Sequence, residues 1–350
     1  MHACMSLVLR ICTAKCVYMS CESQAAGGGG TRREEEERGQ LAGHRGGGQE
    51  TRGKETDLPK LMGFVSARRG EREEMQDAHV LLPDLTATNL PSQVSRLAYF
   101  AVFDGHGGAR ASQFAAENLH HTLVSKFPKG DGENLEKLVR KCLLDTFRQT
   151  DEDFLKKASS QKPAWKDGST ATCMLMVDDV LYVANLGDSR AVLCRLEQAE
   201  DSGKRKCVTL ALSKEHNPTI YEERMRIQRA GGSVRCVCGR VLGVLEVSRS
   251  IGDGQYKRCG VISTPDVRRC QLSPNDKFVL LACDGLFKVF SADEAVQFVL
   301  NILENETVEQ KEGQSEGAGR FEATCQRLAS EAVRRGSADN VTVILVSIEF

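Results

Sequence analysis

Residues 97 to 108 read Leu97–Ala98–Tyr99–Phe100–Ala101–Val102–Phe103–Asp104–Gly105–His106–Gly107–Gly108. The first seven of these residues are apolar, and their number and aromatic content favour a buried strand over a helix. The glycines that follow end the strand abruptly, so we expect the Asp104 carboxylate at a strand end. A carboxylate at the edge of an apolar layer needs hydrogen-bond donors, a cation or a metal ion, because an unpaired buried charge is costly.

A second apolar stretch, far away in the sequence, ends in the same way. It reads Phe278–Val279–Leu280–Leu281–Ala282–Cys283–Asp284–Gly285. Asp-Gly is a common turn pair, so a strand-ending turn explains either copy taken alone. Two further aspartates, Asp188 and Asp339, also flank apolar segments with the composition of strands. Together these acids favour a metal site over a set of unrelated turns.

The composition is that of a folding chain without a strong charge field. The 350 residues are 41% hydrophobic, and the formal net charge is −1. This balance provides no basic field for nucleic acid or an anionic membrane, and no apolar run approaches the roughly 18 residues of a membrane span. The 14 cysteines are scattered rather than spaced as a disulfide framework. We therefore expect a reduced, cytoplasmic protein, with a nuclear fraction left open.

The chain divides into a tail and one domain. Residues 1–58 contain ten of the 32 glycines and the charge run Arg32–Arg33–Glu34–Glu35–Glu36–Glu37–Arg38, with almost no apolar periodicity after Ala26. This composition predicts disorder, because the segment has too little apolar surface to bury. From residue 59 to residue 350, short apolar segments alternate with turn signals, which predicts a single domain.

Antiparallel strands and outer helices are expected within this domain. Residues 168–177 and 180–186 are largely apolar and are separated by Asp178 and Asp179, which is a hairpin signal. Apolar residues recur near helical spacing in residues 109–126, which favours an amphipathic helix packed on a sheet. Further helices are expected at residues 133–157, 221–230, 291–303 and 320–335, and a further strand at residues 341–348.

The acids point to hard cations. Oxygen ligands without histidine pairs or thiolate clusters suit Mg²⁺ or Mn²⁺. Two such ions bridged by one carboxylate can lower the pKa of a shared water and clamp a phosphoryl group for in-line attack. The sequence has no Walker A loop and no His-Cys-x5-Arg anion loop. The residues thus predict a metal-assisted hydrolase, with phosphate as a candidate substrate group.

Seven segments form an ordered set along the domain. They are Glu71–Arg72–Glu73–Glu74–Met75–Gln76–Asp77–Ala78, Phe103–Asp104–Gly105–His106–Gly107–Gly108, Asp167–Gly168–Ser169–Thr170–Ala171, Asn185–Leu186–Gly187–Asp188–Ser189–Arg190, Val247–Ser248–Arg249–Ser250–Ile251–Gly252–Asp253, Ala282–Cys283–Asp284–Gly285 and Ser337–Ala338–Asp339–Asn340–Val341–Thr342. In this order they resemble the signatures of the metal-dependent serine/threonine phosphatases of the PP2C type, over about residues 59–350. The resemblance implies an α+β fold, an α/β sandwich of two mainly antiparallel β-sheets packed face to face with helices on the outside.

The same resemblance implies the ligands of two ions, Mg²⁺ or Mn²⁺. Asp104 would bridge the two ions, and the carbonyl of Gly105 would bind one of them. Asp284 and Asp339 would bind the other. A hydroxide held by the ions would attack phosphoserine or phosphothreonine in proteins, without a phosphoenzyme.

The resemblance also implies roles for side chains around the ions. Arg72 would hold the substrate phosphate as a charge-assisted fork. His106 would be the general acid that protonates the departing serine or threonine oxygen, a task that suits an ordinary pKa of about 6.5. Asp77 and Asp188 would lie behind the metal ligands, where Asp77 would orient metal-bound water.

Two positions depart from the family pattern. Gln76 replaces a usual glutamate, which weakens one water-mediated metal contact. The family motif Asp-Gly-x-x-Asp begins at Asp284 in this chain, and Lys288 stands at the position of its last aspartate. Its positive charge predicts two strong metal sites and a weak or absent third site, the one that would involve Asp188.

Partners follow from the resemblance alone. Residues 214–219 and 239–246 resemble one group within this family more closely still, and that likeness implies an integrin-linked kinase complex as a partner besides phosphoprotein substrates. We expect a monomeric catalytic domain without a nucleic-acid partner.

Two alternatives to the phosphatase function stay open. One is a non-catalytic signalling scaffold, favoured by Gln76 and Lys288, and the other is a metal nuclease, which has the same acids but lacks a basic stripe.

Overall fold

The computed structural model describes residues 58–85, 87, 90–130, 134–198, 205–235, 238–305 and 315–350. The tail predicted for residues 1–58 lies outside the described residues, apart from Leu58. Within the described ranges, no helix is long and apolar enough to cross a membrane.

Two five-stranded sheets form the centre of the fold, and their strands pair antiparallel. The first sheet has the order β1 (Lys60–Arg68), β13 (Val341–Glu349), β12 (Asp276–Ala282), β8 (Arg190–Gln198) and β9 (Arg205–Ala211). The second sheet has the order β11 (Asp266–Gln271), β7 (Val180–Leu186), β6 (Ala171–Val177), β3 (Leu97–Phe103) and β2 (Ala78–Leu82). β6 and β7 form the expected hairpin, in which Val177 pairs with Val180.

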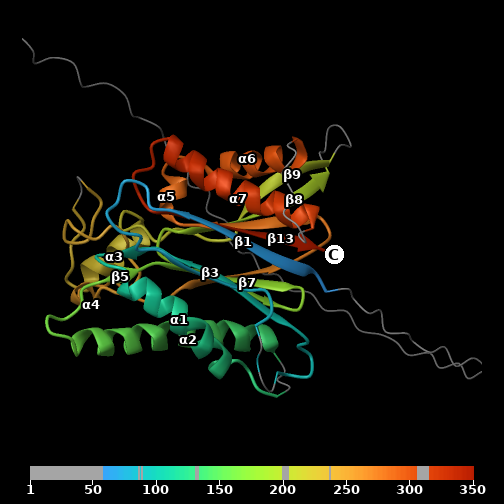
Figure 1. The fold of residues 1–350 in the computed structure, drawn as a ribbon. Coiled ribbons are helices and arrows are strands. Elements are labelled where there is room, and N and C mark those ends of the chain that lie inside the picture. The colour runs from blue at the N-terminus through green and yellow to red at the C-terminus, as the bar shows by residue number, and fades with distance from the viewer. Residues whose placement is uncertain are drawn as a thin grey trace, which may run out of the picture. The chain divides into compact units, whose positions relative to one another are not determined.

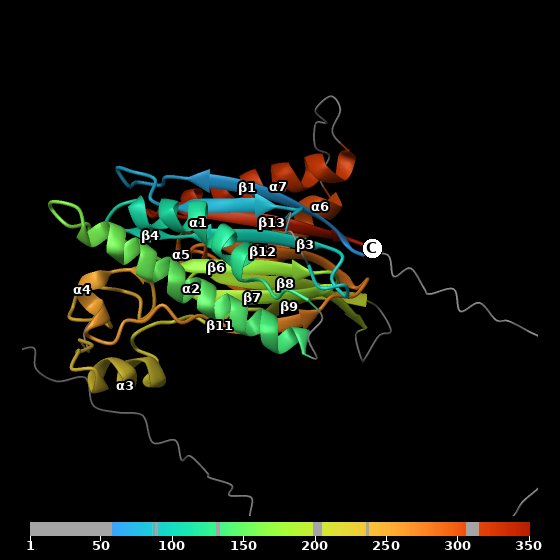
Figure 2. The same cartoon turned by 90° about the horizontal axis from the view of Figure 1, so that it is seen from below.

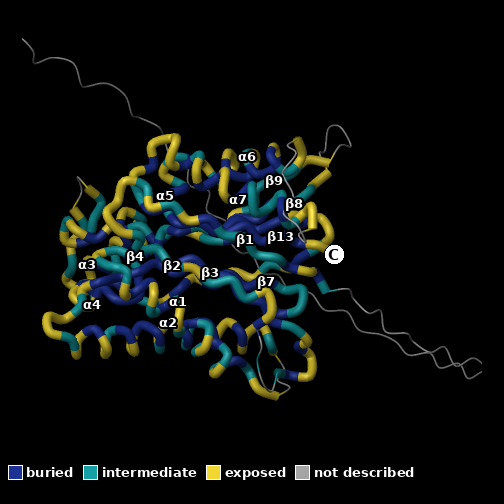
Figure 3. The backbone as a smooth tube through the Cα atoms, viewed as in Figure 1, coloured by how far each residue is buried: buried dark blue, intermediate teal, exposed yellow. Residues whose placement is uncertain are grey.

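The two sheets pack face to face over a shared apolar core (Figure 1). The second sheet contributes Phe100, Met174 and Val183 to this core. The first sheet contributes Leu281 and Ile344, and none of the five side chains is more than 1% exposed. Burial of this apolar surface is the main favourable contribution to the free energy of folding. Figure 3 shows the buried residues concentrated in the strands between the two layers of helices.

Strand β3 coincides with the apolar run at residues 97–103, and all seven of its residues are buried. Successive side chains of a strand point to opposite faces of the sheet. Accordingly, Tyr99 and Phe103 pack beneath the helices on the outer face, whereas Phe100 and Val102 pack between the sheets. The run is uninterrupted by polar residues because both faces of this strand are covered.

Helices cover the outer faces of both sheets (Figure 1). α1 (Arg110–Lys126) and α2 (Leu135–Ser159) pack on the second sheet, and α6 (Ala292–Asn305) and α7 (Glu316–Arg334) pack on the first. α6 begins with a capping box, in which the Glu294 N–H donates to the Ser291 hydroxyl at 3.2 Å and the Ser291 N–H donates to the Glu294 carboxylate at 2.8 Å. The architecture is the predicted α+β sandwich.

Smaller elements gather at one end of the sandwich (Figure 2). A three-stranded sheet there has the order β10 (Ile251–Gly252), β5 (Gly168–Ser169) and β4 (Gly105–His106). α3 (Tyr221–Arg229) and α4 (Gly254–Lys257) lie at the same end, away from the C-terminus, and α5 (Asp284–Phe287) follows β12. β3, β7 and β12 all finish at this end, which is where the predicted site residues lie.

Candidate active site

Antiparallel pairing brings together residues that are far apart in the sequence. β3 and β7 both end beside the first residues of β6, and β12 ends beside the first residues of β8 and β13. Asp104, Asp188 and Asp284 follow the three ending strands within two residues. Asp339 precedes β13 by two residues. All four aspartates therefore lie at one edge of the sandwich.

Three of these aspartates form a compact oxygen cluster. One carboxylate oxygen from each of Asp104, Asp188 and Asp284 lies within 4.8 Å of the other two. The cluster opens into a cleft of about 800 Å³. The cleft is also lined by the other predicted site residues Arg72, Gly105, His106 and Asp339. The structure thus brings seven of the eight predicted residues to one cleft. The carboxylate oxygens of Asp188 and Asp104 are close enough for both groups to bind the same ion.

Burial disfavours the charged form of these carboxyl groups. It raises the pKa of Asp104 well above the ordinary range, and the nearby charges of Asp77 and Asp284 add to the effect. Burial is also the largest cause that raises the pKa of Asp188 to about 7 and that of Asp77 to about 6. A nearby positive charge would reverse these shifts.

The donor set fits a divalent cation. It consists of oxygen atoms, which are the ligands that Mg²⁺ and Mn²⁺ prefer. The eighth predicted residue, Asp77, has a buried Oδ1 without a hydrogen-bond partner among the described residues, while its Oδ2 accepts a 2.6 Å bond from the Thr342 hydroxyl. A buried oxygen without a partner is costly. A divalent ion and its water in this region would relieve both the mutual repulsion of the acids and this deficit.

We expect the metal-free protein to lose stability as the pH rises from about 4 to about 7. The folded-state pKa values of Asp77 and Asp188, about 6 and about 7, lie above the ordinary 3.8. Over this window the folded chain holds protons that the unfolded chain has released, so rising pH favours unfolding. Thermal unfolding in chelator measures the decline, and Mn²⁺ should remove it. A melting temperature that climbs across this window in chelator would contradict the prediction.

Two basic side chains contact the fourth aspartate. Oδ2 of Asp339 accepts hydrogen bonds from Lys288 Nζ at 2.6 Å and from Arg72 Nη2 at 3.0 Å. Burial would raise the pKa of Asp339, but the Lys288 ammonium, together with Arg72, holds it below its usual value. The Arg72 side chain is 59% exposed, so it stands at the mouth of the cleft, where a phosphate group can reach it.

His106 is paired with Asp253, an aspartate for which the sequence alone predicted no role. Its Nε2 lies 2.7 Å from Oδ2 of Asp253, which also accepts a 2.7 Å bond from the Ser250 hydroxyl. Burial alone would lower the pKa of His106, but the charge of Asp253 and its hydrogen bond raise the pKa above 6.5. Asp253 ends the segment 247–253 quoted above, yet no spacing connects it to His106, which is 147 residues away.

The sequence matches a known family over most of its length. The matching family model is described as Protein phosphatase 2C and covers residues 62–341. This chain belongs to the protein phosphatase 2C family. It is therefore a hydrolase of the serine/threonine protein phosphatase type, in a family that is generally metal-dependent.

Named relatives and solved structures agree with this assignment. The integrin-linked kinase-associated serine/threonine phosphatase 2C of Bos taurus is 67% identical over 290 residues, which cover 82% of this chain and 77% of the relative. The protein of the same name from Homo sapiens is 67% identical, with 82% and 72% covered. A crystal structure of serine-threonine phosphatase 2C from Toxoplasma gondii has the same fold, with a TM-score of 0.66 at 24% identity over 84% of this chain and 96% of that one.

In this phosphatase 2C the hydrogen bond between His106 and Asp253 lies directly against Gly168. A Cβ atom on Gly168 would overlap both His106 Nε2 and the Asp253 carboxylate. We expect Gly168→Ala to separate the pair and to lower kcat for phosphate release by about tenfold to a hundredfold, with the fold retained. Steady-state kinetics with circular dichroism measures both. Gly317→Ala, where a Cβ meets nothing within 4 Å, is the matched control. Unchanged kcat in folded Gly168→Ala would contradict the prediction.

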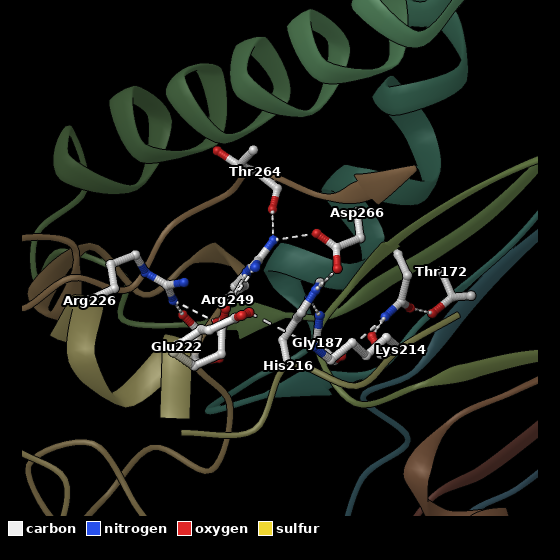
Figure 4. Close-up of polar contacts among 12 residues, drawn as sticks. Thr172, Gly187, Lys214, His216, Glu222, Arg226, Arg249, Thr264 and Asp266 are labelled. Atoms are coloured by element: carbon white, nitrogen blue, oxygen red, sulfur yellow. Dashed lines mark hydrogen bonds and ion pairs between the residues drawn. The ribbon is translucent and has the colours of Figure 1, made fainter. Parts of the chain in front are cut away.

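A polar network around the buried His216 supports the turn after β7 in this phosphatase (Figure 4). His216 is 1% exposed, and its ring Nδ1 accepts a 3.1 Å bond from the Gly187 N–H, while the backbone N–H of His216 donates to the Gly187 carbonyl at 2.9 Å. Because Nδ1 accepts, the ring proton is on Nε2, which lies 3.2 Å from Asp266. Arg249 donates to Asp266 at 3.0 Å and continues the network into α3. The network therefore fixes the residue that precedes Asp188.

Proposed function

We propose that this phosphatase hydrolyses phosphoserine and phosphothreonine in proteins with two divalent ions, Mg²⁺ or Mn²⁺. One observation carries the proposal, the oxygen cluster of Asp104, Asp188 and Asp284 that shares a cleft with His106. Family membership supports the reaction class, and the oxygen donors support hard cations. Two such ions, when bound, lower the pKa of a shared water and offset the charge of the phosphate.

Five residues would hold the ions. We assign Asp104 as the bridging ligand and the carbonyl of Gly105 as a ligand of one ion. Asp284 and Asp339 would hold the other. Asp188 is close enough to Asp104 and Asp284 to contribute a further oxygen, which supports a larger role than a position behind the ligands.

Other side chains of the cleft bind the substrate phosphate and protonate the leaving group. Arg72 binds the substrate phosphate and exchanges its present partner, Asp339, for phosphate oxygens. His106 holds a proton beside Asp253 and delivers it to the departing serine or threonine oxygen, which would otherwise leave as a poor, charged leaving group. The phosphoryl group would pass directly from the serine or threonine oxygen to water and leave as phosphate, without a phosphoenzyme.

Phosphate release from a phosphothreonine peptide tests this proposal. The full chain is compared in Mn²⁺, in Mg²⁺ and in chelator, with Mn²⁺ restored after chelation. We expect turnover with either ion, none in chelator and recovery on restoration. A folded chain that binds Mn²⁺ but releases no phosphate from this or a phosphoserine peptide would overturn the proposal and favour the signalling scaffold. Full turnover in chelator would overturn its metal requirement.

We further propose that the chain acts in the cytoplasm as a monomeric catalytic domain associated with an integrin-linked kinase complex. The name of the relatives that are 67% identical to it supports the association. Affinity purification of the tagged chain from a cytosolic fraction, with immunodetection of the kinase, tests the association. Size-exclusion chromatography with light scattering tests the monomer. A kinase that is present in the input but absent from the eluate would overturn the association.

A further inference from the structure

Lys288 places a positive charge between two acids of the cleft. Its Nζ lies 2.7 Å from Oδ2 of Asp284 and 2.6 Å from Oδ2 of Asp339. Lys288 directly follows α5, and its N–H donates to the Asp284 carbonyl at 2.8 Å. Lys288 is thus held one helical turn after Asp284, the first residue of α5. From there its side chain also reaches Asp339, which lies in the segment before β13.

The rest of the oxygen cluster has no comparable partner. Among the described residues, no cationic side chain forms an ion pair with Asp104 or Asp188, and Arg72 pairs with Asp339 alone. Lys288 is therefore the side chain that neutralises Asp284 within the described ranges. Its ammonium lies at the two carboxylates that we assign to one divalent ion.

The ammonium and a divalent ion cannot both occupy this position. Oδ2 of Asp339 already accepts from the ammonium at 2.6 Å, and a divalent ion would bind a carboxylate oxygen at roughly 2 Å. Two positive charges at such separations repel strongly. Lysine has a flexible four-carbon stem, and the Lys288 side chain is 43% exposed, so it has room to turn toward solvent.

We propose that Lys288 is an internal counter-ion that competes with a divalent ion for Asp284 and Asp339. The ammonium neutralises these carboxylates when the ion is absent and turns away when the ion binds. The inference rests on the proposed function in one respect, the assignment of these two acids as metal ligands. By linkage, whatever stability the ammonium adds to the metal-free fold weakens ion binding by the same amount. Lys288 would then set the ion concentration at which the cleft fills.

Lys288→Met tests the competition, because methionine keeps a long, unbranched stem and removes the charge. Calorimetric titration of the full chain with Mn²⁺, without substrate, measures affinity directly. We expect the variant to bind Mn²⁺ about tenfold tighter or more. In chelator it should melt below the wild type, and its gain in melting temperature on Mn²⁺ addition should be larger. Lys277→Met removes the same charge from an exposed position at the far end of β12, and we expect wild-type values for it.

Equal or weaker Mn²⁺ binding by Lys288→Met would overturn the inference. Lys288→Gln, which is also neutral, supplies the same comparison if the methionine variant does not fold. Phosphate release is scored separately. A wild-type chain that binds Mn²⁺ but releases no phosphate would refute the proposed reaction, while the ratio of the two Mn²⁺ affinities would still decide the role of Lys288.

Discussion

Asp104→Asn is expected to lower kcat for phosphate release from a phosphothreonine peptide by about a thousandfold or more. Asparagine keeps the size of aspartate but lacks its negative charge, and its amide group would lie within 4.8 Å of oxygens from Asp188 and Asp284. A neutral amide is a poor bridge between two divalent ions. We therefore expect Mn²⁺ binding to weaken together with turnover.

Steady-state kinetics at saturating Mn²⁺ and calorimetric titration with Mn²⁺ measure the two effects. Asp179→Asn is the matched control, because Asp179 lies in the turn between β6 and β7, at the opposite end of β7 from Asp188. The control should keep wild-type kinetics. If kcat of Asp104→Asn stayed within about tenfold of the wild-type value, Asp104 would not be the ligand that bridges the ions.

Asp253→Asn is expected to lower kcat by about a hundredfold and to move the alkaline limb of its pH profile to lower pH. The carboxylate of Asp253, 2.7 Å from His106 Nε2, favours the protonated ring and so raises the pKa of His106. A general acid must be protonated to act, so activity falls as the pH rises through this pKa. Without the Asp253 charge the pKa drops, and the fall begins earlier.

The pH dependence of kcat for wild type and Asp253→Asn, both saturated with Mn²⁺, isolates the contribution of Asp253, because the ions are the same in both. His106→Asn and the double variant complete the cycle. If Asp253 acts through His106, the double variant should be no slower than His106→Asn alone. An alkaline limb that does not move in Asp253→Asn would show that Asp253 only supports the local fold.

Local patterns in the sequence predicted the longer helices and several of the strands. β3 occupies the apolar run 97–103 as expected, and α1 occupies Arg110–Lys126 where a helix was predicted at 109–126. These elements are predictable because their periodicity is set by neighbours within a few residues. α7 begins at Glu316, four residues before the predicted start, because the Ser315 hydroxyl accepts from the Ala318 N–H at 3.3 Å and caps the helix there.

The sequence by itself also determined the family, because seven short segments in order are enough to identify it, and each acid at a strand end was visible as such. Only the tertiary structure decided which side chains meet. His106 and Asp253 are 147 residues apart, and Lys288 and Asp339 are 51 apart. Such contacts depend on how antiparallel strands bring distant loops to one edge, and neither hydrophobic period nor turn chemistry carries that information.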